Sequence, residues 1–276
     1  MTRRAHLATA ALAALIATST AFGACAPVTS LLTLFPSRGE IALGGAERVM
    51  IEDGAGAIET IRARSPGARK EAARAIVLRF YGNADRADGG PASEAEGFGA
   101  WPVEVWGVNY PGFGRSEGSA SLRGVARAAD VALAKADERG VPIFAMGTSM
   151  GTTAALHLAA TGKVRGVMLQ NPPPLAQLIR GRYGWWNLWL VAAPISWGVP
   201  ASLDSLANAK RATMPVVVLS SEHDEIVPFD YQTEIYEAYA GPKARLVAKG
   251  AAHNDRLPDA VWDEVRRKLR EQGWGP

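Results

Sequence analysis

The chain has 276 residues, of which 48% are hydrophobic and 21% charged, a composition that supports a full core and excludes a disordered protein. The formal net charge of +3 comes from 30 Lys and Arg against 27 Asp and Glu. These charges occur without basic blocks, which argues against nucleic acid as a partner. Cys25 is the only cysteine, so an internal disulfide framework and a cysteine-rich zinc site are excluded.

The N-terminal segment, residues 1–24, has the layout of a secretory signal peptide. Arg3 and Arg4 form a short basic start, Leu7 to Ile16 is rich in alanine and leucine, and small residues follow. Phe22-Gly-Ala-Cys25 resembles a bacterial lipobox, in which the cysteine is acylated and becomes the mature N-terminus. The pattern therefore predicts an exported cell-envelope lipoprotein, held on the membrane by acyl chains on Cys25.

Two other interpretations of this segment stay open. Cys25 can be an incidental residue beside an ordinary cleavage site, which predicts plain secretion. The segment can also be an uncleaved anchor, because no Asp, Glu, Lys or Arg occurs from Ala5 to Ser37 and a bilayer is spanned by about 20 residues. Residues 25–40 are expected to form a linker, followed by one domain over residues 41–276.

Short apolar runs alternate with amphipathic stretches along this domain, as in a mostly parallel sheet with crossover helices. The sequence before Ala75 is expected to supply the first, antiparallel strands. The runs that predict later strands are Ala75–Phe80, Val103–Val108, Val141–Met146, Val164–Leu169, Val216–Leu219 and Ala244–Ala248. The stretches that predict helices are Leu122–Arg139, Gly151–Ala160, Tyr231–Ala240 and Asp259–Glu271.

The alternation is interrupted at residues 175–213, which contain no strand-like run. This segment holds Trp185, Trp186, Trp189 and Trp197, half of the 8 tryptophans. It is either an excursion that packs its aromatic rings on the core or a short Trp-rich cap over an apolar pocket, since loops at strand ends of such sheets often carry function.

Gly147-Thr-Ser149-Met-Gly151 stands between a predicted strand and a predicted helix. A G-x-S-x-G sequence in this position is typical of a nucleophile elbow, a sharp turn that exposes the serine hydroxyl. Glycines two positions before and after the serine avoid collisions where strand and helix crowd together. The helix N-terminus also favours a developing negative charge. Ser149 is the predicted nucleophile.

A serine hydroxyl attacks at neutral pH only when a base removes its proton. Of the histidines, His6 lies in the signal segment, His157 on a predicted helix, and His223 at the exit of a strand. His253 lies in the loop between the last predicted strand and the last helix, and is the predicted base.

A carboxylate is needed to orient the imidazole. The turn after the strand Val216–Leu219 offers Glu222, Asp224 and Glu225. Asp224 is the preferred candidate because its side chain is short and well placed in the turn, whereas acidic turn residues such as the two glutamates are ordinarily solvated.

Tyr81-Gly-Asn83-Ala84 closes an early strand. The backbone N–H groups of Asn83 and Met150 are the predicted oxyanion-hole donors, and an ordinary turn is the alternative interpretation of Tyr-Gly-Asn. Donors of this kind contribute roughly 3–4 kcal/mol each in related acyl-transfer sites.

Together these motifs resemble the α/β-hydrolase superfamily, in particular serine hydrolases of the Bem46 and ABHD13 types. The motifs are Tyr81–Ala84, Val108–Gly118, Gly147–Gly151, Asp224–Pro228 and His253, and the order Ser149, Asp224, His253 is the order in that superfamily. The resemblance covers Ala75 to Gln272 and implies a mostly parallel sheet flanked by helices, with a Ser-His-Asp triad that hydrolyses an ester, thioester or amide. Tyr81 stands where that group commonly has a histidine that organises the oxyanion loop.

The favoured function is a serine esterase that acts on a small-molecule or lipid acyl substrate through an acyl-enzyme. An acyltransferase or a peptidase with the same triad is an alternative, and so is a catalytically silent binding protein, since fold alone does not guarantee chemistry. The sequence contains no metal-ligand cluster, dinucleotide fingerprint or P-loop, so no cofactor and no metal are expected.

Overall fold

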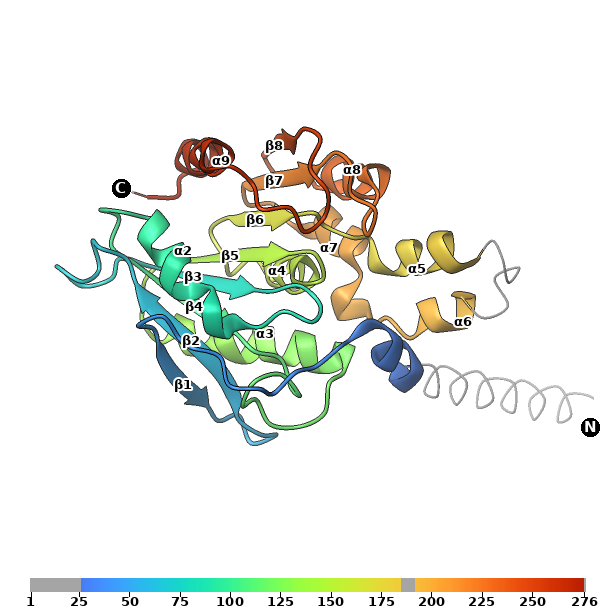
Figure 1. Cartoon of the computed structure of the whole chain (residues 1–276), viewed down its shortest axis with the longest axis horizontal. Helices are drawn as coiled ribbons and strands as arrows, with labels where there is room; N and C mark the ends of the chain where they lie inside the picture. Colours follow the sequence, from blue (N-terminus) through green and yellow to red (C-terminus); the bar gives the residue numbers. More distant parts are fainter. Residues whose placement is uncertain (1–25, 185–191, 276) are drawn as a thin grey trace, which may run out of the picture.

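The computed structural model describes residues 26–184 and 192–275. Its centre is one eight-stranded sheet with strand order β1-β2-β4-β3-β5-β6-β7-β8 (Figure 1). β1 and β2 pair antiparallel, as do β2 and β4, which confirms the antiparallel strands expected before Ala75; the other neighbouring pairs are parallel. The strands are β1 (Glu47–Ile51), β2 (Ile58–Arg64), β3 (Ala75–Phe80), β4 (Val103–Val108), β5 (Ile143–Thr148), β6 (Val167–Gln170), β7 (Val216–Ser221) and β8 (Lys243–Ala248).

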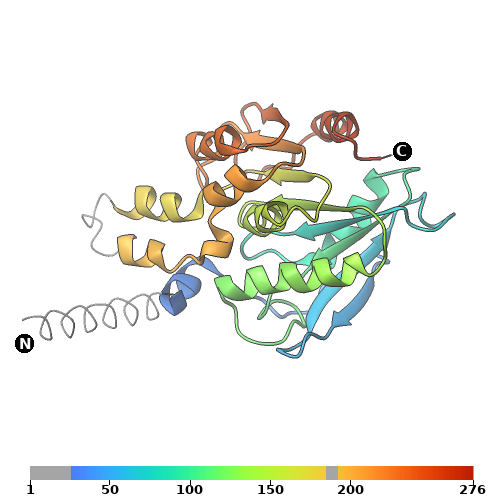
Figure 2. The same ribbon diagram turned by 180° about the vertical axis from the view of Figure 1, so that it is seen from behind.

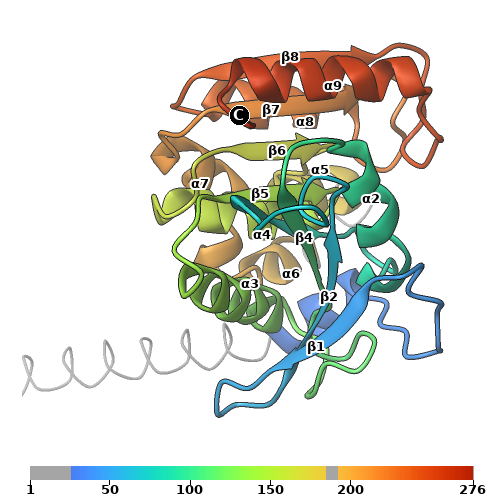
Figure 3. The ribbon, with the colours of Figure 1, turned by 90° about the vertical axis from the view of Figure 1, so that its left-hand side faces the viewer.

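Helices cover both faces of the sheet, as the alternating pattern predicts. Figure 2 shows α3 and α4 lying across one face, and Figure 3 shows α2 on the opposite side of the strands from α3. The helices are α2 (Pro91–Gly97), α3 (Leu122–Asp137), α4 (Gly151–Ala160), α5 (Leu175–Gly184), α6 (Ala192–Trp197), α7 (Ser205–Arg211), α8 (Phe229–Ala238) and α9 (Asp259–Glu271), with short 3-10 turns at Ala87–Gly89 and Ala201–Leu203.

Two hydrophobic cores, one on each face, follow from the alternation of side chains along the strands. In β3, Ile76, Leu78 and Phe80 join the core that packs under α3, α4 and α7, whereas Ala75 and Val77 join the core under α9. All the residues of β3 are buried, as expected for a central strand covered on both sides.

The predicted strand bounds agree with the structure at β3 and β4 and are shifted at β5 and β6. β5 begins at Ile143 rather than Val141, after Pro142, which lacks the N–H that a central strand donates. β6 begins at Val167 rather than Val164, after Gly166, where a side chain would collide with Trp274.

The interrupted region, residues 175–213, contains α5, α6 and α7 and no strand among its described residues. Trp185, Trp186 and Trp189 lie outside the described residues, and Trp197 ends α6 with an exposed side chain. The structure therefore describes a helical excursion here, with α5 and α6 standing beyond the strand ends (Figure 1).

The region expected to be a linker differs from that expectation, because residues 26–33 are helical and Thr29 and Leu34 are buried against the domain. In Figure 1 this helical segment lies beside α6. The predicted signal peptide and Cys25 lie outside the described residues. Within the described ranges, no helix combines the length and apolarity needed to cross a membrane.

Candidate active site

Ser149 occupies a strained turn between β5 and α4. Its φ of 51° lies in the left-handed region, which non-glycine residues adopt only where the surrounding structure enforces it. A Cβ on Gly147 would lie 2.6 Å from the carbonyl oxygen of Gly151, and one on Gly151 would lie 2.3 Å from that of Phe80. The two glycines are therefore required by close backbone approach, as the motif predicts.

The structure brings Ser149, His253 and Asp224 together from three loops at one edge of the sheet. Nε2 of His253 lies 3.0 Å from Oγ of Ser149, and Nδ1 of His253 lies 2.6 Å from Oδ2 of Asp224. Because a carboxylate can only accept, Nδ1 carries the proton and Nε2 is free to accept the serine hydroxyl hydrogen. These are the contacts that general-base activation of a serine requires.

Asp224 is held in place by four hydrogen bonds. Oδ1 accepts the backbone N–H groups of Ile226 (2.9 Å) and Val227 (2.7 Å), while Oδ2 accepts from Gln232 (3.1 Å) as well as from His253. Its side chain is fully buried. A carboxylate fixed in this way orients the imidazole ring and stabilises its cation.

Two buried polar residues support this arrangement and were missed by sequence analysis. Gln232, on α8, donates to Asp224 and to the carbonyl oxygen of Val227. Asn171, after β6, accepts from the N–H of Ser221 and donates to the carbonyl oxygen of His253 at 3.3 Å. Asn171 has a positive φ of 50°, a backbone conformation that asparagine adopts more readily than most residues.

The loop after β3 lies against Ser149. A Cβ on Gly82 would sit 3.5 Å from the Cβ of Ser149, so the chain passes close to the serine at this position. Met150 caps the N-terminus of α4, where backbone N–H groups lack helical partners. Oδ1 of Asn83 accepts the N–H of Phe35 at 2.9 Å, which ties this loop to the N-terminal segment.

A buried polar network lies beneath this loop. Arg79 donates to Glu94 (2.8 Å), to the carbonyl oxygen of Phe80 (2.8 Å) and to Oγ1 of Thr148 (2.8 Å), directly before the nucleophile. Tyr81 donates its hydroxyl to the same Glu94 at 2.9 Å, and the guanidinium of Arg79 lies 4.5 Å from the Tyr81 ring centroid.

Within this network Tyr81 has a structural role. Burial, together with the neighbouring Glu94, raises the pKa of Tyr81 well above its ordinary value. The hydroxyl therefore keeps its proton and acts as a fixed donor. Arg79 links the strand that leads into the loop with the strand that leads into the elbow.

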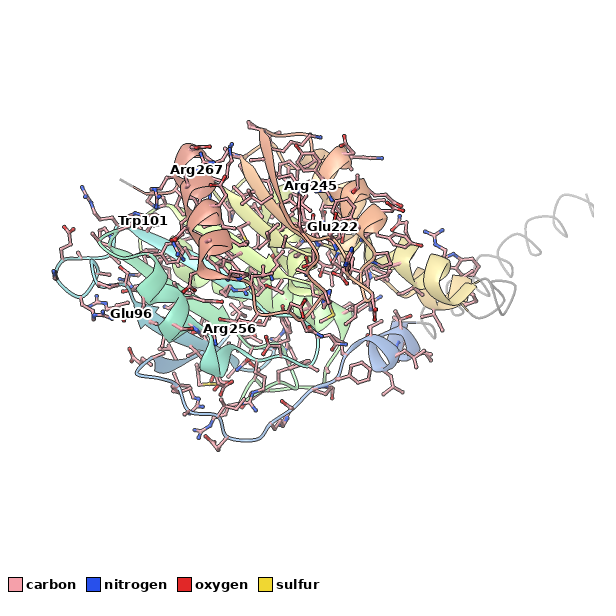
Figure 4. The ribbon with its side chains drawn as sticks, turned by 45° about the horizontal axis from the view of Figure 1, so that its top comes forward. Glu96, Trp101, Glu222, Arg245, Arg256 and Arg267 are labelled. Carbon is pink, nitrogen blue, oxygen red and sulfur yellow. The ribbon has the colours of Figure 1, made fainter. Side chains whose placement is uncertain are left out.

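A cavity of about 380 Å³ lies behind the elbow, between α2 and α9. Arg79 and Gln170 line it together with Arg256, which lies in the loop between His253 and α9 and is labelled in Figure 4. Gln170 accepts from Thr148 at 3.2 Å. The cavity therefore adjoins the supporting network rather than the triad itself.

The other candidates are not assembled with Ser149. His157 pairs with Asp130 at 2.8 Å between α3 and α4, and the His223 side chain is 70% exposed. Glu222 accepts the N–H of Gly250, and Glu225 lies in the exposed turn. His6 lies outside the described residues. In the part of the chain that the structure describes, no group of His, Cys, Asp and Glu has the arrangement of a metal site.

No protein-family model matches the chain. An uncharacterised protein of Mycobacterium tuberculosis is 29% identical over 171 residues, 59% of this chain and 58% of the relative. The α/β hydrolase domain-containing protein aho-3 of Caenorhabditis elegans is 27% identical over 171 residues, 60% of this chain and 48% of the relative. The matches thus span about half to three fifths of these curated relatives.

Solved structures share the fold along most of their length. Est1E from Butyrivibrio proteoclasticus, in a structure with bound ferulic acid, has a TM-score of 0.65 at 14% identity, over 81% of this chain and 98% of its own. An α/β serine hydrolase homologue from Coxiella burnetii has a TM-score of 0.59 at 17% identity, over 84% and 98%. The chain therefore has the α/β-hydrolase fold.

Proposed function

We propose that this protein is a serine hydrolase of the α/β-hydrolase superfamily that cleaves carboxylic ester or acyl bonds through an acyl-enzyme. The observation that carries the proposal is the chain of short contacts from Ser149 to His253 to Asp224. The named hydrolases among the structural neighbours support the same reaction class. Within the superfamily, the motifs favour the Bem46 and ABHD13 types.

The proposed reaction begins when Nε2 of His253 takes the hydroxyl proton of Ser149 as Oγ attacks the acyl carbonyl. Asp224, fully buried and locked by its other donors, stabilises the resulting imidazolium. The proton then passes from His253 to the leaving oxygen. Water, deprotonated by the same imidazole, releases the acid from Ser149.

The negative oxygen of the tetrahedral intermediate needs two donors. We assign them to the backbone N–H groups of Met150 and Asn83. Met150 lies at the N-terminus of α4, where the helix dipole also favours negative charge. Asn83 follows Gly82, the residue that lies against Ser149.

The decisive experiment is covalent labelling of the full chain with a fluorophosphonate. We expect the wild type to be labelled and Ser149→Ala to be inert, while Ser93→Ala, which removes a hydroxyl on α2, is labelled like the wild type. A folded wild type that stays unlabelled and hydrolyses no activated ester contradicts the proposal.

We further propose an apolar acyl substrate. The support is a set of exposed apolar side chains on the N-terminal segment and α6, namely Leu31, Phe35 and Trp197. A series of p-nitrophenyl esters of increasing chain length tests this. The value of kcat/KM is expected to rise from acetate to medium-chain esters, and a flat or falling series contradicts an apolar acyl pocket.

Finally, we propose that the protein is exported and anchored to a membrane through an acylated Cys25. The support is the lipobox-like sequence that ends at this residue. Intact-mass analysis of the purified protein is expected to show cleavage before Cys25 plus acyl chains, both lost in Cys25→Ser. Cleavage without acylation indicates plain secretion, and an intact N-terminus indicates an uncleaved anchor.

A further inference from the structure

The helical segment 26–33 is amphipathic in the reverse of the usual sense. Val28, Leu31 and Leu32 are 48%, 76% and 54% exposed, whereas Thr29 and Ser30 are 0% and 7% exposed. A helix on a water-soluble domain normally turns its apolar stripe to the core and its polar residues to solvent. Here the apolar residues, spaced by three and four positions, lie on the outer side.

The buried hydroxyls explain how this orientation is held. Thr29 donates to the carbonyl oxygen of Ile195 at 2.5 Å, on α6. Ser30 donates to the carbonyl oxygen of Ala26 and accepts the N–H of Leu122 at 3.2 Å. These polar contacts attach the segment to α6 and to the start of α3. Because the buried hydroxyls have hydrogen-bond partners on this side, the leucines face outward.

Two neighbouring residues extend the same outer surface. Phe35, one turn beyond Leu31, is 58% exposed, and Trp197, at the end of α6, is 55% exposed. We call Val28, Leu31, Leu32, Phe35 and Trp197 the apolar face. A mostly apolar cavity of about 580 Å³ adjoins it, between Leu31 and Leu34 on one side and the loop at Ala120 on the other.

The apolar face also lies next to the proposed reaction centre. The N–H of Phe35 is bonded to Oδ1 of Asn83, a residue of the loop that passes Ser149. A surface on which the apolar face rests would therefore meet the protein beside the oxyanion loop. Trp and Phe are typical of such positions because their rings suit the boundary between hydrocarbon and water.

We propose that the apolar face docks into the interfacial region of a lipid bilayer and turns the active-site edge toward lipid-borne substrate. The sequence favours a bilayer as occupant, because the apolar run Leu7–Ile16 lies directly upstream and no Asp, Glu, Lys or Arg occurs from Ala5 to Ser37. A charge-free helix face with leucine and aromatic residues partitions into the headgroup boundary. Docking of the face is distinct from attachment through Cys25, which needs no particular face of the domain.

The single native cysteine permits a direct test on the full chain. In a Cys25→Ser background, Leu32→Cys and, as a matched control, Met50→Cys are each labelled with a polarity-sensitive fluorophore. Met50 is 38% exposed on β1. With vesicles of phosphatidylcholine and phosphatidylglycerol, we expect a blue shift at position 32 and none at position 50.

The control separates docking from simple tethering. If the chain is held only by its N-terminal residues, the probes at positions 32 and 50 both remain in water on vesicle-bound protein, and the proposal is overturned. A blue shift at position 32 that appears without vesicles and grows with protein concentration identifies a second copy of the chain as the occupant, which also overturns it.

A second variant tests the consequence for substrate access and rests on the proposed function. Val28→Glu/Leu32→Glu is expected to keep wild-type hydrolysis of a soluble short ester and to lose about tenfold or more of its activity on a vesicle-embedded ester, since each exposed apolar side chain contributes strongly to partitioning. If the variant keeps wild-type activity on the vesicle-embedded ester as well, the docking proposal is overturned. If the wild type hydrolyses no soluble ester, the proposed function is overturned instead, and the fluorophore result still stands.

Discussion

Among the described residues, two short histidine–carboxylate contacts have the same local chemistry and different surroundings. His253 pairs with Asp224 at 2.6 Å at the edge of the sheet, and His157 pairs with Asp130 at 2.8 Å between α3 and α4. The Asp224 side chain is fully buried, whereas that of Asp130 is 56% exposed. The short contact between imidazole and carboxylate is therefore not what separates the two sites.

The difference lies in what the rest of each pair touches. Asp224 accepts three further hydrogen bonds, from Ile226, Val227 and Gln232, and the second nitrogen of His253 reaches Ser149. In the second pair the Asp130 carboxylate is open to solvent, which weakens its contact with His157, and no serine of the described residues reaches the His157 ring. Burial, locking of the carboxylate and a serine on the far nitrogen together make a pair capable of general-base chemistry.

The largest effect is expected from Asp224→Asn. An amide at this position donates or accepts without a charge, so it permits the wrong histidine tautomer and leaves the imidazolium without a counter-charge. We expect kcat for a soluble ester to fall by about 10⁴-fold with a nearly unchanged fold. Steady-state kinetics together with circular dichroism measure both. An unchanged kcat would show that Asp224 does not serve His253.

Asp88 is a buried carboxylate that does not pair with a histidine, so it tests the effect of burial alone. Its side chain is as buried as that of Asp224, but its partners are Arg86, Arg48 and Asn109. Burial alone would raise the pKa of Asp88, but the hydrogen bonds from Arg86 and Asn109 outweigh it and hold the pKa below its ordinary value. We expect Asp88→Asn to cost about 3 kcal/mol of unfolding free energy, because Arg86 is left buried and unpaired.

The sign of the pH dependence follows from the lowered pKa of Asp88. The stabilisation is complete above the ordinary carboxyl value of about 3.9 and is lost as the pH falls through the lower folded value. Urea unfolding at neutral and acidic pH should therefore show a stability gap between the wild type and Asp88→Asn that narrows in acid. A gap that widens in acid contradicts the assignment, and kcat of the folded variant is expected to stay near the wild-type value.

A variant of Arg79 tests whether the polar network beside Ser149 affects kcat as strongly as the contact between His253 and Asp224. Arg79 donates to Thr148 and to the carbonyl oxygen of Phe80, and so sets the spacing between Ser149 and the loop after β3. We expect Arg79→Met/Glu94→Gln, which removes both charges, to lower kcat by about tenfold with a smaller change in KM, because misplaced donors weaken mainly the transition state.

The matched control for Arg79 is the exposed pair of Arg69 and Glu96, the latter labelled in Figure 4. Arg69→Met/Glu96→Gln removes the same groups from the surface and should leave kcat within about twofold. If the two double variants reduce kcat equally, or if Arg79→Met/Glu94→Gln raises only KM, Arg79 is not a positioning residue for the elbow.

The elements that follow from local pattern could be predicted from the sequence. The apolar runs of β3 and β4 and the helices α4 and α9 have the predicted bounds. The two glycines of the elbow predicted that backbone atoms come close together there, as the structure shows. The sequence also predicted the three residues that the structure brings together at the sheet edge. Their catalytic role stays a prediction.

The residues that could not be predicted act through tertiary contacts. Asn171 contacts Ser221 and His253. Gln232 contacts Asp224 from α8, where Gln232 and Ile235 are the buried residues. Neither contact has a local signature. The helical segment 26–33 lies in the region that was expected to be a linker. Its apolar residues face outward in the structure, the reverse of the pattern by which a packed helix is predicted from sequence.

The smallest effect is expected from Asp130→Asn, the counterpart of Asp224→Asn in the second pair. The half-exposed Asp130 side chain is screened by solvent, and its contact is worth at most a few tenths of a kcal/mol to about 1 kcal/mol. We therefore expect kcat and KM within about twofold of wild type, and a small loss of thermal stability measured by calorimetry. If Asp130→Asn instead lowered kcat by orders of magnitude, a histidine–carboxylate contact alone would be enough to matter for catalysis, and the argument from burial, locking and the serine contact would fail.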